Sequence, residues 1–292
     1  MTTWPCLKSG GRLFRRAVLK AAVLSVTALT TIAIAGPGSA QSLLDKIKNG
    51  ETIRLGFSNE PPFANPGRNN EPLGWVNAMA LDILKMLGTA KVEPVVTEWG
   101  SLIPGMHADR FDIITGGMYI LPDRCKNVVF TEPIGVLSAA LLVPKGNPEN
   151  LNSYKDLREK GLIVVTGAGW DDVVNARNAG IAEDHILQVA GSAEVLQAVK
   201  AGRAAAGVGD YFTLKEFAEK DPSMDVTDPL PDTPKGYPAF AFLSNQQAAV
   251  DAFNAALKDY LGSDQMMRSV GKYGYAKVNL PDGTTAAQLC KG

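Results

Sequence analysis

Residues that serve as imidazole bases or soft metal ligands are scarce in this sequence. It contains two histidines, His107 and His185, and three cysteines among 292 residues. No group of residues has the spacing of a metal site, and no serine, histidine and aspartate follow a nucleophile-elbow pattern. Both histidines fall in predicted surface positions. We therefore predict no metal, no cofactor and no enzymatic activity.

Acidic residues are absent from the first forty positions, which carry five Lys or Arg residues. An apolar stretch at 21–35 and the small residues of 36–40 follow, which is the order of a secretory signal peptide. A transmembrane anchor is the alternative, but fifteen apolar residues fall short of the ~20 that a bilayer requires. We predict that residues 1–40 are a signal peptide, cleaved after Ala40, and that the mature chain is periplasmic. Arg15-Arg16 leaves Sec and twin-arginine export both open.

A basic cluster is also missing from the rest of the chain. Without the five basic residues of the signal, 24 basic residues stand against 30 acidic ones, a net charge of about −6. Such a chain has no electrostatic footprint for nucleic acid or anionic lipid. About 250 residues are enough for one large domain or two lobes.

Cysteine is limited to two residues in the mature chain, because Cys6 leaves with the signal. Cys125 and Cys290 remain, and an oxidising compartment favours a disulfide between them over two free buried thiols. The residue directly after the predicted cleavage site is Gln41 and not a cysteine, so the chain does not have the pattern of a lipoprotein.

Short apolar runs alternate with helical patterns, which predicts an α/β protein with mostly parallel sheets. Predicted strands cover 52–57, 91–96, 111–115, 162–166, 185–189 and 204–209. Predicted helices cover 77–87, with Asn77 as N-cap, and 102–108, 171–179, 193–201, 248–261 and 265–273.

Two segments interrupt this alternation. The apolar run 136–143 has the length of a strand that passes from one lobe to another, and the proline-rich segment 229–238 is predicted to cross back. We predict a discontinuous lobe I of 41–137 and 238–292 and a lobe II of 138–237. A ligand is expected in the cleft between them, where strand ends and helix N-termini point.

Five motifs in order carry a resemblance to a known family. They are Ser58-Asn59-Glu60-Pro61-Pro62-Phe63, Glu98-Trp99-Gly100-Ser101-Leu102-Ile103-Pro104-Gly105, Arg110-Phe111-Asp112-Ile113-Ile114-Thr115-Gly116-Gly117-Met118, Pro122-Asp123-Arg124-Cys125 and Phe130-Thr131-Glu132-Pro133. The series resembles polar amino-acid-type periplasmic binding proteins, and most of all the ectoine- and hydroxyectoine-binding proteins. The resemblance implies a two-lobed type II periplasmic-binding-protein fold with two crossing strands.

The same resemblance assigns roles in the cleft. It implies that Arg124 holds a ligand carboxylate through its guanidinium fork. It places Phe63, Trp99 and Tyr119 around a cationic ligand ring. It also implies that the Glu60 carboxylate accepts hydrogen bonds from the N–H groups of that ring. The alternatives are a surface arginine, core packing of the aromatic residues and a turn-capping carboxylate.

Further cleft positions follow from the resemblance. Gly117 lies in the third motif. The turn 167–169 precedes a helix, and its bare N–H groups, with Gly169 among them, could share the carboxylate with Arg124. Trp170 replaces the small hydroxyl residue usual in relatives, and either adds a wall or shrinks the pocket. Asp210 occupies the position of the aspartate that binds an α-ammonium group.

The resemblance implies a receptor that captures a small zwitterion of ectoine or hydroxyectoine type and delivers it to the permease subunits of an ABC importer. A polar amino-acid receptor is the alternative, although Ala78 and Leu121 depart from the Asp and Thr often found in those members. A cyclohexadienyl dehydratase-like enzyme on the same fold is the other alternative. We expect a monomer.

Overall fold

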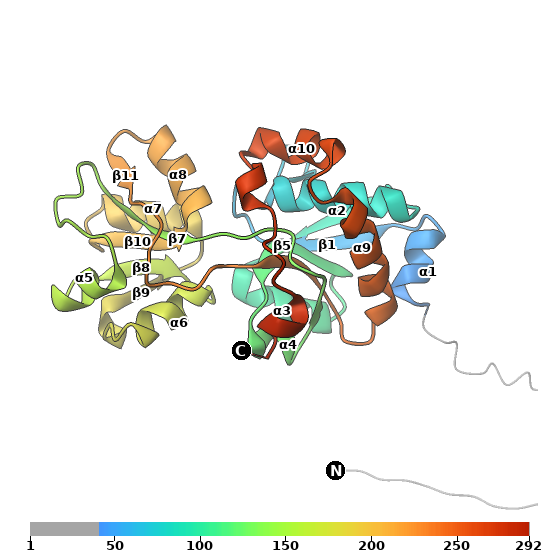
Figure 1. Cartoon of the computed structure of the whole chain (residues 1–292), viewed down its shortest axis with the longest axis horizontal. Helices are drawn as coiled ribbons and strands as arrows, with labels where there is room; N and C mark the ends of the chain where they lie inside the picture. Colours follow the sequence, from blue (N-terminus) through green and yellow to red (C-terminus); the bar gives the residue numbers. More distant parts are fainter. Residues whose placement is uncertain (1–40, 292) are drawn as a thin grey trace, which may run out of the picture. The chain divides into compact units, whose positions relative to one another are not determined.

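The structure is a computed structural model that describes residues 41–291. The predicted signal peptide and its cleavage site lie outside the described residues. Figure 1 shows two β-sheets, each flanked by helices. Within residues 41–291, no helix is long and apolar enough to cross a membrane.

The first sheet has the strand order β4-β1-β5-β12-β6. Its strands are β1 (Ile53–Phe57), β4 (Val92–Val96), β5 (Ile113–Tyr119), β6 (Val129–Phe130) and β12 (Pro238–Phe242). Strand β1 pairs in parallel with β4 and β5, whereas β12 runs antiparallel to β5 and β6. The carboxyl ends of β1 and β5 therefore lie at the same edge of the sheet.

The second sheet has the strand order β11-β7-β10-β8-β9. Its strands are β7 (Ala139–Pro144), β8 (Val164–Gly167), β9 (Ile186–Val189), β10 (Ala206–Asp210) and β11 (Met224–Val226). Strand β8 is parallel to β9 and β10, and β7 is antiparallel to β10 and β11. In each sheet four strands run in the same direction and one runs against them: β12 in the first sheet and β7 in the second, each the first strand after a crossing segment. The prediction of mostly parallel sheets therefore holds for the strand directions, and the one reversed strand makes each sheet mixed.

Helices cover the sheets through apolar stripes. In α9 (Gln247–Tyr260) the buried residues recur every three or four positions, and they share one core with α2 (Trp75–Leu87) and β1. In β7, alternate residues belong to different clusters: Leu141 and Val143 to one, Ala140 and Leu142 to another. The second sheet is therefore covered on both faces.

The remaining described elements are shorter. The helices are α1 (Leu43–Lys48), α3 (Leu102–His107), α4 (Pro122–Cys125), α5 (Tyr154–Glu159), α6 (Asp171–Asn178), α7 (Ser192–Lys200), α8 (Tyr211–Lys220), α10 (Asp264–Val270) and α11 (Ala286–Leu289). Strands β2 (Asn65–Pro66) and β3 (Pro72–Leu73) form a small hairpin. The 3₁₀ turns are η1 (Trp99–Ser101), η2 (Glu183–His185), η3 (Gly271–Tyr273) and η4 (Lys277–Asn279).

The chain passes between the two sheets twice, once between β6 and β7 and once between β11 and β12. The two crossing segments pair through one isolated antiparallel bridge, in which Leu137 and Gly236 exchange N–H···O bonds of 2.9 Å each way. The apolar run 136–143 is thus not one strand, because only Ala139 onward joins the second sheet.

Two details of the helices differ from the predictions. Helix α2 begins at Trp75 with Gly74 as N-cap at φ 102°, so the prediction of Asn77 as N-cap was wrong. The buried Asn77 amide instead donates to the Leu73 carbonyl at 2.9 Å and accepts from the Thr115 hydroxyl at 2.6 Å. Helices α5 and α8 and the short helices α1, α4 and α11 were not predicted.

The predicted disulfide is present. Cys125, at the end of α4, is bonded to Cys290, one residue beyond α11, with the Cα atoms 5.7 Å apart. The bond spans 165 residues and fixes the C-terminal segment against α4, the helix that carries Arg124.

Candidate ligand-binding site

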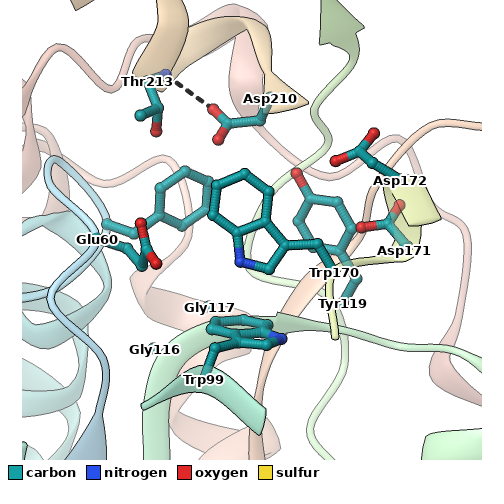
Figure 2. Close-up of a pocket in the computed structure, with 11 residues that line it drawn as sticks. Glu60, Trp99, Gly116, Gly117, Tyr119, Trp170, Asp171, Asp172, Asp210 and Thr213 are labelled. Carbon is teal, nitrogen blue, oxygen red and sulfur yellow. Dashed lines mark hydrogen bonds between the residues drawn. The ribbon is translucent and has the colours of Figure 1, made fainter. Parts of the chain in front are cut away.

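A cavity lies where the strand ends of the two sheets meet. It contains about 470 Å³ of space not filled by protein atoms, part of it open to solvent. Its walls, drawn in Figure 2, are Glu60, Phe63, Trp99, Gly116, Gly117, Tyr119, Trp170, Asp171, Asp172, Asp210 and Thr213. Seven of the nine predicted ligand-binding residues are among them, and Arg124 and Gly169 are the two that are not.

The carboxyl ends of the strands position these side chains. Gly116, Gly117 and Tyr119 belong to β5, and Asp210 ends β10. Trp170 follows β8 as the N-cap of α6. At Gly117, φ is 76° and an added Cβ would come within 2.6 Å of the Phe63 ring, so a side chain here would displace that wall.

The aromatic residues of the first sheet have other packing partners besides the cavity. Phe63 is only 6% exposed and packs against Trp75 and Phe212, with ring centroids 5.1 and 6.4 Å away. The Tyr119 ring lies against Gly236, where an added Cβ would come within 2.1 Å of it. Both rings are therefore held firmly, with limited surface left for a ligand.

Arg124 lies beside the cavity and joins the two sheets. Its guanidinium donates to the Tyr119 carbonyl at 2.9 Å and to the Gly169 carbonyl at 3.0 Å, and it lies 5.6 Å from the centroid of the Trp99 ring. Trp99 Nε1 donates to the same Gly169 carbonyl at 3.2 Å. Burial lowers the pKa of Arg124, which nearby Asp171 partly offsets.

The turn before α6 uses some of its backbone groups within the protein. The Gly169 carbonyl accepts from Arg124 and from Trp99. The N–H groups of Ala168 and Trp170 are used by the carbonyls of Val189 and Gly167, at 2.7 and 3.1 Å. Among residues 41–291 the Gly169 N–H has no backbone partner, so its predicted part in binding an anion stays a prediction, although the first turn of α6 carries carboxylates of its own.

Glu60 is a buried carboxylate that reaches from the first sheet to α7. Its Oε2 accepts from the backbone N–H of Ser192, at the helix N-terminus, at 3.1 Å. Burial raises the pKa of Glu60 to about 7 against the opposing effect of that hydrogen bond, with Asp210 and Glu194 adding repulsion. Near neutrality Glu60 therefore holds a proton more readily than an exposed carboxyl group does, and a nearby cation would favour its ionisation.

Three more carboxylates stand on the second-sheet wall. Asp210 is the N-cap of α8 and accepts from the Thr213 N–H at 2.9 Å; burial raises its pKa to about 6. Asp172 is 4% exposed and accepts from the Tyr154 hydroxyl at 3.2 Å. Burial, and then its neighbour Asp171, raise the pKa of Asp172. The wall is therefore acidic and poorly hydrated.

Sequence reasoning missed Asp171, Asp172 and Thr213 as cavity residues. Aspartates in the first turn of a helix are common because they complement the helix dipole. Asp171 and Asp172 fit that role, so nothing in the local pattern indicated that they line the cavity. The available signal was their place directly after Trp170. For Thr213 the signal was the Asp-x-x-Thr start of α8, a helix that was not predicted.

The two histidines lie outside the cavity. His107 Nε2 is hydrogen-bonded to the Asn127 carbonyl at 3.0 Å in an exposed position, and His185 lies in η2. Among residues 41–291, no group of three or more His, Cys, Asp or Glu side chains could hold a metal ion.

Two mixed sheets, two crossing segments and a polar-aromatic cavity between strand ends define the class of two-lobed solute-binding proteins. Residues 53–276 match the model of the bacterial extracellular solute-binding proteins, family 3, and the chain belongs to that family. It is thus an extracytoplasmic solute-binding receptor of an amino-acid-type ABC transporter with the type II periplasmic-binding fold.

Individual relatives agree with this assignment. A probable amino-acid ABC transporter periplasmic-binding protein of Sinorhizobium fredii is 31% identical over 279 residues, covering 92% of each chain. The structure of EhuB in complex with hydroxyectoine is similar at 29% identity and a TM-score of 0.77, covering 85% of this chain and 97% of that one. An ancestral amino-acid-binding protein, described as a precursor of cyclohexadienyl dehydratase, is similar at 28% identity and a TM-score of 0.69, covering 80% and 99%.

Proposed function

We propose that this receptor captures a small zwitterion with a delocalised or quaternary cation, of the ectoine or hydroxyectoine type, and delivers it to the membrane subunits of an ABC importer. The observation that carries the proposal is the lining of the cavity, which combines four aromatic rings with four carboxyl groups. A diffuse cation loses little hydration on burial and gains from ring faces.

The two ends of such a ligand have different partners. Glu60 lines the cavity, and we propose that it accepts N–H groups from the cationic ring. Its raised pKa is that of a buried carboxyl group. Arg124 is the nearest guanidinium, and we propose that it holds the ligand carboxylate by exchanging a carbonyl partner for it. The similarity to EhuB, solved with hydroxyectoine, supports this assignment.

A polar amino acid is the second candidate, favoured by one observation. Asp210 lines the cavity at the end of β10, where a carboxylate could accept from a compact α-ammonium group. Several relatives bear the names of amino-acid-binding proteins. An α-ammonium group bound by Asp210 does not require aromatic rings, so the aromatic lining of the cavity would be unexplained. We therefore rank this candidate lower.

The proposal includes the organisation of the chain. We assign residues 1–40 to a signal peptide cleaved after Ala40, 41–137 and 238–292 to lobe I, and 138–237 to lobe II. Each crossing segment then connects the two lobes. Of the residues that line the cavity, Glu60, Trp99 and Tyr119 belong to lobe I. We propose a periplasmic monomer that acts without a cofactor and without nucleic acid.

Thermal-shift screening of the mature protein against ectoine, hydroxyectoine, betaines and amino acids tests the proposal. A ligand that binds only the folded state raises the melting temperature by mass action, and we expect the largest shift from an ectoine-type solute. No shift from any zwitterion would contradict it. Incubation with prephenate or arogenate tests the alternative, because turnover of either would make the protein an enzyme.

A further inference from the structure

Trp170 rests on two glycines of the second sheet. An added Cβ at Gly167, the last residue of β8, would lie 2.2 Å from Cε2 of the indole. At Gly209 in β10, it would lie 3.1 Å from Cζ3. Only glycine at 167 leaves room for this ring position, since backbone-bound Cβ atoms do not approach that closely. The two glycines thus fix the position of the Trp170 ring. The ring lines the cavity, as Figure 2 shows.

The other aromatic walls have less free surface for a cation. Phe63 is 6% exposed, and the Trp99 ring already has the Arg124 guanidinium 5.6 Å from its centroid. A ring quadrupole that already faces one cation attracts a second one less. Tyr119 has its ring against Gly236.

The charged residues that line the cavity beside Trp170 are all acidic. Asp171 and Asp172 follow it directly in the sequence, and Asp210 follows Gly209; all three line the cavity. Among the described residues that line it, none is Lys or Arg. The wall that contains Trp170 thus combines an aromatic surface with carboxyl groups. Arg124 reaches this wall at the Gly169 carbonyl, 3.0 Å away, but does not line the cavity.

We infer that the cationic part of the ligand lies on the Trp170 indole, with Asp171, Asp172 and Asp210 around it, and that Trp170 determines the preference for a diffuse cation. This inference rests on the proposed function, and it goes further by assigning cation recognition to the lobe II wall rather than to Phe63, Trp99 and Tyr119. Glu60 then faces the cation from the lobe I side of the same cavity, and the ligand carboxylate points towards Arg124.

A matched pair of probes separates recognition of charge from burial of apolar surface. Glycine betaine and 3,3-dimethylbutanoate have the same shape and the same carboxylate, but a carbon replaces the cationic nitrogen in the second. Calorimetry on the full mature chain should show that wild type prefers glycine betaine at least tenfold. Since only the charge differs between the probes, this ratio measures cation recognition.

Substitution then locates the preference. Trp170→Leu should weaken binding of glycine betaine and ectoine at least tenfold and reduce the ratio between the matched probes to below threefold. Trp170→Phe keeps a ring and should retain most of that ratio. Trp99→Leu, the matched change on the opposite wall, should lower the ratio less than Trp170→Leu does. Gly209→Ala, which intrudes on the ring without removing it, gives a second perturbation and should also weaken ectoine binding.

The outcomes separate this inference from the proposed function. If wild type binds ectoine and Trp170→Leu binds it within threefold of wild type, the inference is overturned and the proposed function stands. An unchanged probe ratio in Trp170→Leu would likewise overturn it. If wild type binds neither ectoine nor glycine betaine, both the proposed function and the inference fail.

Discussion

The carboxyl group of Glu60 should make the stability of the ligand-free protein depend on pH. Its pKa is raised from 4.5 to about 7, mainly by burial. The folded state therefore holds this proton at pH values where the unfolded chain has released it. For an acid with a raised pKa, stability falls as the pH rises from the unfolded to the folded pKa, and the loss is complete above the folded pKa.

The magnitude follows from these two values. Raising a pKa from 4.5 to about 7 corresponds to roughly 3 kcal/mol of unfavourable ionisation in the fold. Linkage gives a cost of about 1 kcal/mol at pH 5 and about 3 kcal/mol at pH 8. Glu60→Gln removes the charge, and the amide oxygen can still accept from the Ser192 N–H. The variant should therefore gain about 2 kcal/mol over wild type between pH 5 and pH 8.

Urea unfolding of wild type and Glu60→Gln at pH 5, 6, 7 and 8 measures this difference without any ligand. In melting temperature, 1 kcal/mol amounts to about 2–4 °C for a chain of this size. The exposed Glu93→Gln on edge strand β4 is the matched control and should show no pH-dependent gain. A stability difference between wild type and Glu60→Gln that is the same at pH 5 and pH 8 would refute the reasoning.

Three further outcomes are expected. Because a cation favours ionised carboxylates, ectoine affinity measured by calorimetry should fall as the pH drops from 8 to 5, through the pKa values of about 7 and 6 at Glu60 and Asp210; equal affinity at both pH values would contradict this. Arg124→Ala should weaken binding by ~2–5 kcal/mol while the circular dichroism spectrum stays that of wild type, and affinity within threefold of wild type would show that Arg124 is not the anchor. Thiol titration of the unfolded, unreduced mature chain should find no free thiol, and reduction of Cys125–Cys290 should lower stability by at most about 5 kcal/mol; two free thiols before reduction would contradict the bond.

The sequence was sufficient to predict the class, the crossing segments and most of the cavity residues. These features depend on local patterns: apolar runs of strand length, a Pro-Pro turn after β1 and motifs at strand ends. Helix α8 was missed although Asp210 is its N-cap, because the same aspartate was interpreted only as a ligand residue. A capping role and a cavity position are compatible when a strand ends at the cavity edge.

The charge of the second-sheet wall could not be predicted from local patterns. Asp171 and Asp172 have the pattern of ordinary helix caps, and only the packing of the indole of Trp170 on Gly167 and Gly209 brings that segment to the cavity. The direction of the Gly169 carbonyl could not be predicted from the sequence either, because the backbone of a glycine turn can adopt several orientations.

The starts of two elements were also set by tertiary contacts. Asparagine is a common N-cap residue, yet the side-chain amide of Asn77 is hydrogen-bonded to Leu73 and Thr115 inside the protein. Strand β7 begins only at Ala139, since the preceding apolar residues cross between sheets. In each case a hydrogen bond to a distant segment, from Thr115 to Asn77 and between Leu137 and Gly236, overrides the local preference.

Competitive calorimetry on the mature protein with ectoine, glycine betaine and a panel of polar amino acids tests the central claim most directly. The aromatic and acidic cavity predicts that ectoine or glycine betaine binds and is not displaced by an equal concentration of any amino acid. Micromolar binding of an ordinary amino acid, with no heat from either ectoine or glycine betaine, would contradict the claim and make Asp210 the principal cation site.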